Sequence, residues 1–332
     1  MTAAAAGFEA VPGHAATRGA PAPAPSVSVV ICTWTGVRWG ELCEAVESVA
    51  RQSQPPLETI VVVDHDPELL ERARGELPKV VVTPNLEARG LSGARNSGLG
   101  LAQGDVVAFL DDDAVATPEW LRLLAAEYED ERVLGAGGAI EPVWEERPGW
   151  FPAEFGWVVG CTYRGLPSER AAVRNLIGAS MSFRRELFAE LGGFCHGIGR
   201  VGTRPVGCEE TEFCLRAGRA HPGGRFVYQP LALVHHRVPA RRAEWRYFLA
   251  RCYGEGLSKA LIVRAAGFRR GLAAERSYTA RVLTSGFCSA LLGTLTLRDR
   301  SGFLRAAAIV AGLAAAAAGF CTGRLRSSVG PA

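Results

Sequence analysis

Apolar residues up to position 111 occur in short continuous runs that alternate with longer, helically spaced segments. The continuous runs predict strands at 26–32, 58–64, 79–83 and 106–110, and the first two have the composition of strands covered on both faces. The intervening segments predict helices over 41–51, 68–77 and 92–103. Strands and helices in this alternation are typical of a parallel, doubly wound α/β sheet.

The pattern from residue 144 onward is less regular, and tryptophan, proline and glycine cluster in WEERPGWFPAEFGWVVG. This clustering favours a surface region with short strands across 144–204. Further strands are predicted over 175–183 and 225–234, and helices over 209–217 and, with an amphipathic pattern, 245–257.

The composition is that of a globular protein with one large or two ordinary domains, since 48% of the 332 residues are hydrophobic and 21% are charged. The first 25 residues are mostly Ala, Pro and Gly and lack a basic region followed by an apolar one. They therefore indicate a flexible tail rather than a signal peptide. Nine cysteines without a Cys-x-x-Cys pair indicate reduced thiols in a cytosolic chain, without a disulfide framework or structural zinc.

Charge and hydrophobicity set the C-terminal region apart. Residues 1–236 carry a formal charge of −9, whereas residues 237–332 carry +12. Such a basic segment indicates contact with an anionic partner. Nucleic acid, an anionic bilayer surface and a phosphorylated substrate all fit this description. Residues 306–323 form an uncharged run of 18. Alanine dominates this run, which favours an interfacial or buried helix over a membrane-spanning one.

Three consecutive carboxylates follow the strand predicted at 106–110, in the sequence VVAFLDDDA. Each negative charge raises the pKa of its neighbours unless a cation neutralises the group. Mg²⁺ and Mn²⁺ prefer oxygen ligands and share their coordination with substrate phosphates, so the position at a strand end favours a metal site at Asp111, Asp112 and Asp113. The alternative is an acidic turn or helix cap, but Thr117 already offers a cap for the next expected helix.

Eight motifs along residues 26–240 occur in an order that is far more specific than any one of them. They are SVVICTWTGV, IVVVDHD, GLSGARNSGL, VVAFLDDDA, GASMSFRR, GGF, CEETEFCLR and LVHHR. The series resembles the family 2 glycosyltransferases of GT-A fold, which implies a Rossmann-like α/β domain with a mostly parallel central sheet flanked by helices. The stretches WVVGCTYRG and RVGTRPVGCEE further resemble the branch that includes glucosyl-dolichyl-phosphate glucuronosyltransferases.

The domain organisation expected from this resemblance has three parts. Residues 1–25 would form the Ala/Pro-rich tail, residues 26–240 the GT-A glycosyltransferase domain, and residues 241–332 a basic, helical C-terminal region in contact with a membrane.

The resemblance implies a role for each matching residue. Thr33, Asp64, Arg95, Asp111 and Asp112 would contact the nucleoside-diphosphate sugar, and Asp113, Asp111 and His236 would hold Mn²⁺ or Mg²⁺. Without the resemblance, Asp64 could equally be a turn residue after a strand. Arg95 would then be an exposed arginine on a helix, and His236 would be a histidine packed in the core.

The catalytic base of the family usually lies in a Glu-Asp pair, whereas this sequence has Glu209 followed by Glu210. The register matches Glu210 to that Asp, and glutamate can serve because the chemistry requires only a base within hydrogen-bond reach of the acceptor hydroxyl. Which of the two glutamates acts stays open. Without the resemblance, both also fit an acidic first helical turn that complements the helix dipole.

The implied reaction is a metal-dependent, inverting transfer of a sugar from a nucleoside-diphosphate sugar, first of all a UDP-sugar, to an acceptor hydroxyl. A polyprenyl-phosphate glycolipid acceptor would account for the basic C-terminal region. The protein would then be cytoplasmic, at the inner face of the cell membrane, and would bind no nucleic acid. Three alternatives stay open: a soluble saccharide or natural-product glycosyltransferase, a nucleotidyltransferase or phosphatase, and a non-catalytic sugar-nucleotide binding protein.

Overall fold

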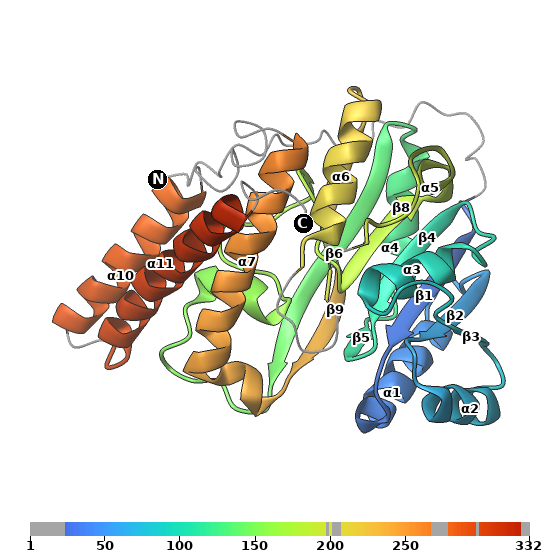
Figure 1. The fold of residues 1–332 in the computed structure, drawn as a ribbon, viewed down its shortest axis with the longest axis horizontal. Coiled ribbons are helices and arrows are strands. Elements are labelled where there is room, and N and C mark those ends of the chain that lie inside the picture. The colour runs from blue at the N-terminus through green and yellow to red at the C-terminus, as the bar shows by residue number, and fades with distance from the viewer. Residues whose placement is uncertain (1–23, 197–198, 201–206, 267–277, 297–298, 327–332) are drawn as a thin grey trace.

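The computed structural model of the chain describes residues 24–196, 199–200, 207–266, 278–296 and 299–326. The tail expected at 1–25 lies outside these ranges except for its last two residues. A nine-stranded sheet forms the centre of the described chain, and helices lie against it on both sides (Figure 1).

The strands run in the order β3-β2-β1-β4-β8-β6-β9-β5, and β7 pairs with β9 off this path. Their bounds are β1 Val27–Thr33, β2 Glu58–Val63, β3 Val81–Pro84, β4 Val106–Asp111, β5 Ala114–Ala116, β6 Val133–Trp144, β7 Ala171–Val173, β8 Ser180–Arg184 and β9 Arg225–Val238. The helices of this part are α1 Trp39–Ala50, α2 Pro67–Glu76, α3 Leu91–Leu99, α4 Trp120–Ala126, α5 Arg185–Leu191 and α6 Glu209–Ala220.

The half of the sheet made by β3, β2, β1 and β4 is parallel, as the alternating pattern predicts. Helices α1, α2 and α3 connect its strands. The helix predicted over 92–103 ends earlier, at Leu99. Cys32 on β1 lies opposite Val62 on β2 and opposite Asp111 on β4, so these three strands end at the same edge. That edge is where an open α/β sheet binds its ligands.

The other half of the sheet is mixed rather than parallel. Strand β8 pairs antiparallel with both β4 and β6, whereas β6 and β9 are parallel to each other. Strand β6 has no counterpart in the sequence prediction because its centre, LGAGGA, consists of residues that are depleted in strands. The strand predicted over 175–183 begins only at Ser180, and the one predicted over 225–234 extends to Val238.

The prediction of a surface region across 144–204 is wrong for its first part. Phe151, Phe155 and Val158 are buried and belong to the main hydrophobic core. A C-terminal helix, α7 (Trp245–Ala266), covers them, and the ring centroids of Phe155 and Phe248 are 5.2 Å apart. The local sequence pattern does not report this cover, because the residues that bury the segment lie far along the chain.

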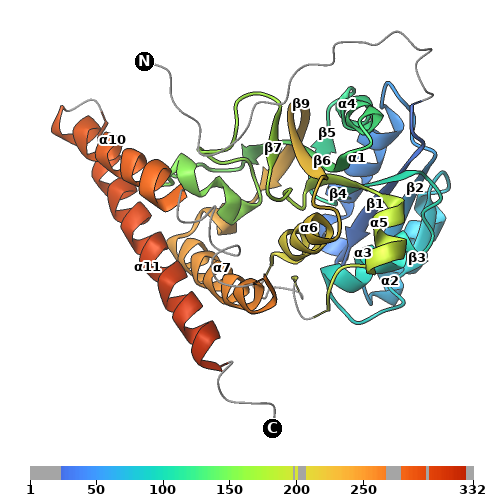
Figure 2. The ribbon, with the colours of Figure 1, turned by 90° about the horizontal axis from the view of Figure 1, so that it is seen from above.

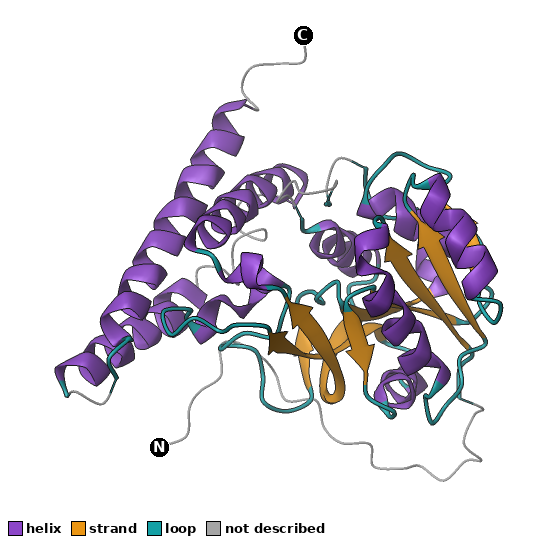
Figure 3. Ribbon diagram, turned by 90° about the horizontal axis from the view of Figure 1, so that it is seen from below, coloured by secondary structure: helices purple, strands orange, loops and turns teal. Residues whose placement is uncertain are grey.

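Helices α7, α10 (Thr284–Leu295) and α11 (Gly302–Arg326) lie side by side at one side of the sheet (Figures 2 and 3). Helices α7 and α11 approach each other through glycines. A Cβ atom at Gly256 would lie 2.0 Å from the carbonyl oxygen of Ala316, and one at Gly319 would lie 2.0 Å from that of Tyr253. Small residues allow two helix backbones to pack closely, so α11 is fixed against α7 along much of its length.

Helix α11 contains the run at 306–323 and is, within the described residues, the helix long and apolar enough to cross a membrane. Only 28% of its most apolar window is buried inside the structure. The run is therefore not a buried helix, which leaves the interfacial and the membrane-spanning alternatives.

Gly138 in β6 gives a stability prediction. A Cβ atom there would lie 1.7 Å from the backbone oxygen of Ala232, at an irregularity in the pairing of β6 with β9. We expect Gly138→Ala to lower the free energy of unfolding by about 2 kcal/mol, because the backbone must move to admit the methyl group. The control is Gly75→Ala in α2, where no atom lies within 4 Å and where alanine should be neutral or slightly stabilising. Equal stability of the two variants in urea unfolding would contradict the close approach.

Candidate active site

A turn between β4 and β5 carries the three carboxylates to the edge where β1 and β2 also end. Strand β4 ends at Asp111 and β5 begins at Ala114, so Asp112 and Asp113 form the turn. Strand β5 pairs antiparallel with β9, and this pairing places Ala114 opposite His236. The sheet register thus brings a histidine from far along the chain beside the carboxylates.

The structure brings together the three side chains that sequence analysis assigned to the metal. One ligand atom each of Asp111, Asp113 and His236 lies within 4.8 Å of the other two. His236 Nε2 is 3.2 Å from Asp113 Oδ1. Burial lowers the pKa of His236, but the nearby Asp113 carboxylate outweighs burial and raises the pKa to about 10. The imidazolium must therefore release a proton before the ring nitrogen can bind a cation.

Two arginines that sequence reasoning missed also contact Asp113. Arg38, in the segment after β1, donates to Asp113 Oδ2 at 2.7 Å, and Arg242, after β9, donates to the same oxygen at 3.1 Å. Burial raises the pKa of Asp113, but His236 and the two arginines together hold it well below the usual range of an aspartate. No spacing rule could have found these arginines, because only the fold brings them to the turn.

Asp112 is 2% exposed, and Arg38 lies 2.9 Å from its Oδ1. Burial raises the pKa of Asp112 to about 7, although Arg38 opposes the shift. The expected helix cap at Thr117 is wrong. The Thr117 hydroxyl instead donates to the carbonyl of Leu233 at 2.9 Å, and α4 has no side-chain cap.

The predicted nucleotide residues Thr33 and Asp64 lie at the ends of β1 and β2, and both are buried. Asp64 accepts hydrogen bonds from Asn85 Nδ2 at 2.6 Å and from the backbone N–H of Gly90 at 2.9 Å. The next residue, His65, has a φ of 54°, which is uncommon for a residue other than glycine. Asp64 is thus held by the loop that leads into α3 rather than being a simple turn residue.

Arg95 is not an exposed helix arginine, because only 2% of its surface is exposed. It donates to Glu209 Oε1 at 2.7 Å and to the carbonyl of Gly178 at 3.1 Å, and its Nη2 is 3.5 Å from Asp111 Oδ1. Burial lowers the pKa of Arg95, but Glu209 and Asp111 outweigh burial and raise it. Arg95 therefore joins the carboxylate turn to the first turn of α6.

Glu209 and Glu210 begin α6 and differ in their surroundings. Glu209 is 3% exposed and paired with Arg95, whereas Glu210 is partly exposed and lines the cavity beside it. Burial, reinforced by the charge of Glu209, raises the pKa of Glu210 to about 8. Cys208, just before them, has a φ of 78°, so the chain enters α6 through an unfavourable backbone conformation. Glu209 is thus engaged by Arg95, whereas Glu210 faces the cavity.

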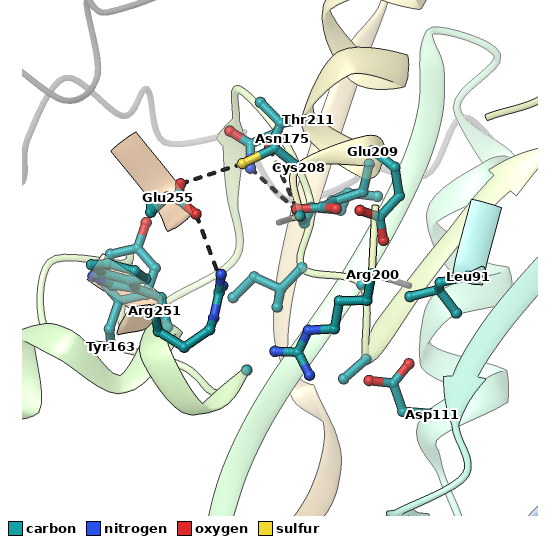
Figure 4. Close-up of a pocket in the computed structure, with 18 of the residues that line it drawn as sticks. Leu91, Asp111, Tyr163, Asn175, Arg200, Cys208, Glu209, Thr211, Arg251 and Glu255 are labelled. Atoms are coloured by element: carbon teal, nitrogen blue, oxygen red, sulfur yellow. Dashed lines mark hydrogen bonds and ion pairs between the residues drawn. The ribbon is translucent and has the colours of Figure 1, made fainter. Parts of the chain in front are cut away.

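The predicted site residues other than His236 border one cavity of about 800 Å³, together with Arg38 and Arg242. It also reaches Arg200 and, on α7, Arg251 (Figure 4). Small and apolar residues of α11 line it as well. The predicted donor and base residues therefore share one site. Sequence reasoning did not anticipate that the C-terminal helices complete its wall, because it treated them as a separate region.

The donor set at the carboxylate turn fits a hard divalent cation, which accepts carboxylate oxygen and imidazole nitrogen ligands. Asp112 Oδ2 and Glu209 Oε2 are buried without a hydrogen-bond partner among the described residues. Such oxygens favour a bound cation or its water ligands nearby. Asp111, Asp113 and His236 would hold the ion, which would supply positive charge against a diphosphate.

Comparison with known proteins shows the family of the chain. Residues 28–192 match the family model described as Glycosyl transferase family 2. A glucosyl-dolichyl phosphate glucuronosyltransferase of Haloferax volcanii is 39% identical over 238 residues, which cover 70% of this chain and 76% of that protein. The chain belongs to glycosyl transferase family 2 and is a glycosyltransferase, which confirms the resemblance seen in the motifs.

A more distant relative is the succinoglycan biosynthesis protein ExoM of Rhizobium meliloti, which is 28% identical over 79% of this chain and 82% of its own. Among solved structures, the mannosyltransferase PcManGT of Pyrobaculum calidifontis, in complex with GDP-Man and Mn²⁺, has a TM-score of 0.58 at 20% identity and covers 91% of this chain and 88% of its own. GalNAc-T7 with UDP, GalNAc and Mn²⁺ has a TM-score of 0.51 at 18% identity over 77% of this chain and 55% of its own. These likenesses confirm the GT-A fold.

Proposed function

We propose that the chain transfers a sugar from a nucleoside-diphosphate sugar to a hydroxyl group on a polyprenyl-phosphate-linked acceptor, with inversion at the anomeric carbon. The observation that carries this proposal is that Asp111, Asp113 and His236 lie within ligand distance of one another, and that Asp111 and Asp113 border the same cavity as Glu210. A cation site and a carboxylate base facing one cavity are the two parts that a single displacement requires.

The roles of the individual side chains follow from their positions. Asp64 and Thr33, at the ends of β2 and β1, would contact the nucleoside, and Asp111, Asp113 and His236 would hold Mn²⁺ or Mg²⁺ against the diphosphate. Arg95 fixes Glu209 in place, and this arrangement leaves Glu210 to take the proton from the acceptor hydroxyl. The acceptor hydroxyl would attack the anomeric carbon on the face opposite the leaving nucleoside diphosphate. A single attack of this kind inverts the configuration at that carbon.

The acceptor assignment rests on the relative whose name specifies a dolichyl phosphate and on the C-terminal helices. These helices border the cavity, and α11 is largely exposed although it is apolar. We infer that the protein is associated with the inner face of the cell membrane and takes its acceptor from there. A UDP-sugar is the donor expected first, and the domain boundaries are expected near residues 25 and 240.

A transfer assay distinguishes this function from that of a soluble transferase. Purified full-length protein is incubated with Mn²⁺ and radiolabelled UDP-glucuronate, with either glucosyl polyprenyl phosphate or free glucose as acceptor. We expect label in the organic phase with the lipid acceptor and none with glucose, and loss of transfer when EDTA removes the metal. Transfer to glucose alone would contradict the lipid acceptor and favour the soluble alternative.

The raised pKa of Glu210 predicts the pH profile of the reaction. A general base must be deprotonated, and the pKa of Glu210 is raised to about 8, so kcat/KM should rise about tenfold per pH unit below that value and level off above it. Replacement by aspartate, the residue usual in the family, keeps a carboxylate and should preserve such a titration. A flat profile between pH 6 and about 9, with Glu210 intact, would contradict its role as base.

A further inference from the structure

The cavity has two chemically different ends. One end is lined by the carboxylates and arginines described above, which match a polar, charged donor. The other end is lined by residues of α11 and its neighbours, namely Leu283, Gly312, Leu313, Ala316, Ala317 and Phe320. A nucleoside-diphosphate sugar has no long apolar group that could fill this second end of the cavity. The second end therefore requires a different ligand.

Cations also border this cavity. Arg251 and Lys259 on α7 border the cavity one turn to either side of Gly256, whose backbone contacts Ala316 of α11. Arg200 also extends into the cavity, between Arg251 and Asp111 (Figure 4).

A carboxylate, Glu255, lies among these cations. Glu255 lies 3.9 Å from Arg251 and 3.3 Å from Lys259, and it accepts a hydrogen bond from Cys208. Burial lowers the pKa of Arg200, and the positive charges of Arg251 and Arg242 lower it further. Asp111 and Glu210 border the same cavity, but three cations beside it supply the donors that an anionic ligand such as a phosphate requires.

The apolar end is continuous with the exterior of the helical region. Leu313 borders the cavity and is 40% exposed, and on α11 it is joined by the exposed side chains of Phe303, Leu304 and Val310. An apolar face of this size on a helix fits the boundary of a bilayer. A chain lying at the apolar end would therefore continue onto the exposed apolar side chains of α11.

We propose that the crevice between α7 and α11 binds the isoprenoid chain of the acceptor lipid, and that Arg200, Arg251 and Lys259 bind its phosphate. This proposal rests on the function proposed above and adds the site of the acceptor. The lipid would be positioned with its phosphate at the cations and its sugar beyond them, towards Glu210 and the donor.

Two variants test the two halves of this site. Ala317 is exposed and lines the crevice, so Ala317→Phe fills it, whereas Ala318→Phe adds the same ring beside it at an exposed position that does not line the cavity. Lys259→Gln removes a cavity cation, and Arg264→Gln removes an exposed cation of the same helix. Ala317→Phe, Ala318→Phe and Arg264→Gln should retain the wild-type melting temperature, because these positions are exposed. Lys259→Gln also removes one partner of the ion pair with Glu255, so thermal melting must show that this variant is folded before its binding is compared.

The measurement is binding of farnesyl phosphate and of farnesol to full-length protein in detergent. We expect Ala317→Phe to weaken binding of both ligands about tenfold, and Lys259→Gln to weaken farnesyl phosphate about tenfold but not farnesol. Ala318→Phe and Arg264→Gln should bind both ligands as the wild type does. Unchanged binding by Ala317→Phe and Lys259→Gln, or equal losses in the two controls, would overturn the assignment.

A second readout separates this proposal from the proposed function. Binding of UDP with Mn²⁺, measured on the same variants, should stay unchanged, because neither Ala317 nor Lys259 contacts the carboxylate turn. A protein that transfers sugar but shows no crevice-dependent farnesyl phosphate binding would refute the lipid site alone. A protein that binds farnesyl phosphate in the crevice but never transfers sugar would refute the proposed function alone.

Discussion

Replacing Asp113 with asparagine should abolish Mn²⁺-dependent binding of UDP or GDP, with an affinity loss of about a hundredfold or more. Asp113 lies at the centre of the cluster, where His236, Arg38 and Arg242 all contact its carboxylate. The amide keeps the size of the side chain but removes the charge that a cation requires. Titration calorimetry with and without Mn²⁺ measures the effect.

Asp112 provides the matched control, because it is adjacent in sequence and equally buried but lies outside the cluster of possible metal ligands. Asp112→Asn should therefore weaken Mn²⁺-dependent binding much less than Asp113→Asn does, because Asp112 would contact the donor or the water ligands of the ion rather than the ion itself. If the two variants lose binding equally, the loss reflects the general charge balance of the turn rather than a metal ligand. Thermal melting of both proteins identifies any loss that comes from unfolding, since removal of one partner of a buried ion pair is destabilising.

Replacing Glu210 with glutamine should lower kcat by about a thousandfold and leave the affinity for the donor nucleotide unchanged. Glu210 borders the cavity, whereas Glu209 is committed to Arg95 through a 2.7 Å hydrogen bond. Glutamine keeps the shape and cannot accept the proton of the acceptor hydroxyl. Initial rates with saturating donor, together with nucleotide binding, separate the two effects.

Glu209→Gln distinguishes a base from a positioning residue. Glu209→Gln should alter the orientation of Arg95 and so lower both nucleotide affinity and rate. The increase of kcat/KM with pH that comes from deprotonation of Glu210 should persist in this variant. A thousandfold loss in Glu209→Gln with little change in Glu210→Gln would reverse the assignment of the base. Retained nucleotide binding with no turnover in the wild type would instead support a non-catalytic binding protein.

The parallel half of the sheet could be predicted because β1, β2 and β4 are continuous apolar runs with helices between them. The same regularity located the candidate site, since Asp64 and Asp111 stand directly at strand ends. Residue types and motif order then associated His236 with the carboxylates, and the register of β5 against β9 accounts for that proximity.

The remainder of the site depends on contacts between distant segments. Arg38 and Arg242 reach Asp113 only because the segments after β1 and β9 meet at one edge. The glycine-rich centre of β6 lacks the composition of a strand, yet β8 and β9 pair with it on either side. Phe155 is buried by Phe248, which no local pattern relates to it. These features follow from tertiary packing, which a single sequence read locally does not encode.

The most direct test of the central claim is phosphorus NMR of the products released from a nucleoside-diphosphate sugar. Full-length protein is mixed with UDP-glucuronate or another UDP- or GDP-sugar, the polyprenyl-phosphate glycolipid acceptor and Mn²⁺. We expect the free nucleoside diphosphate to appear, and only when acceptor and metal are both present. Release of diphosphate or inorganic phosphate, or no product from any of these donors, would contradict a glycosyl transfer assisted by a metal at the carboxylate turn.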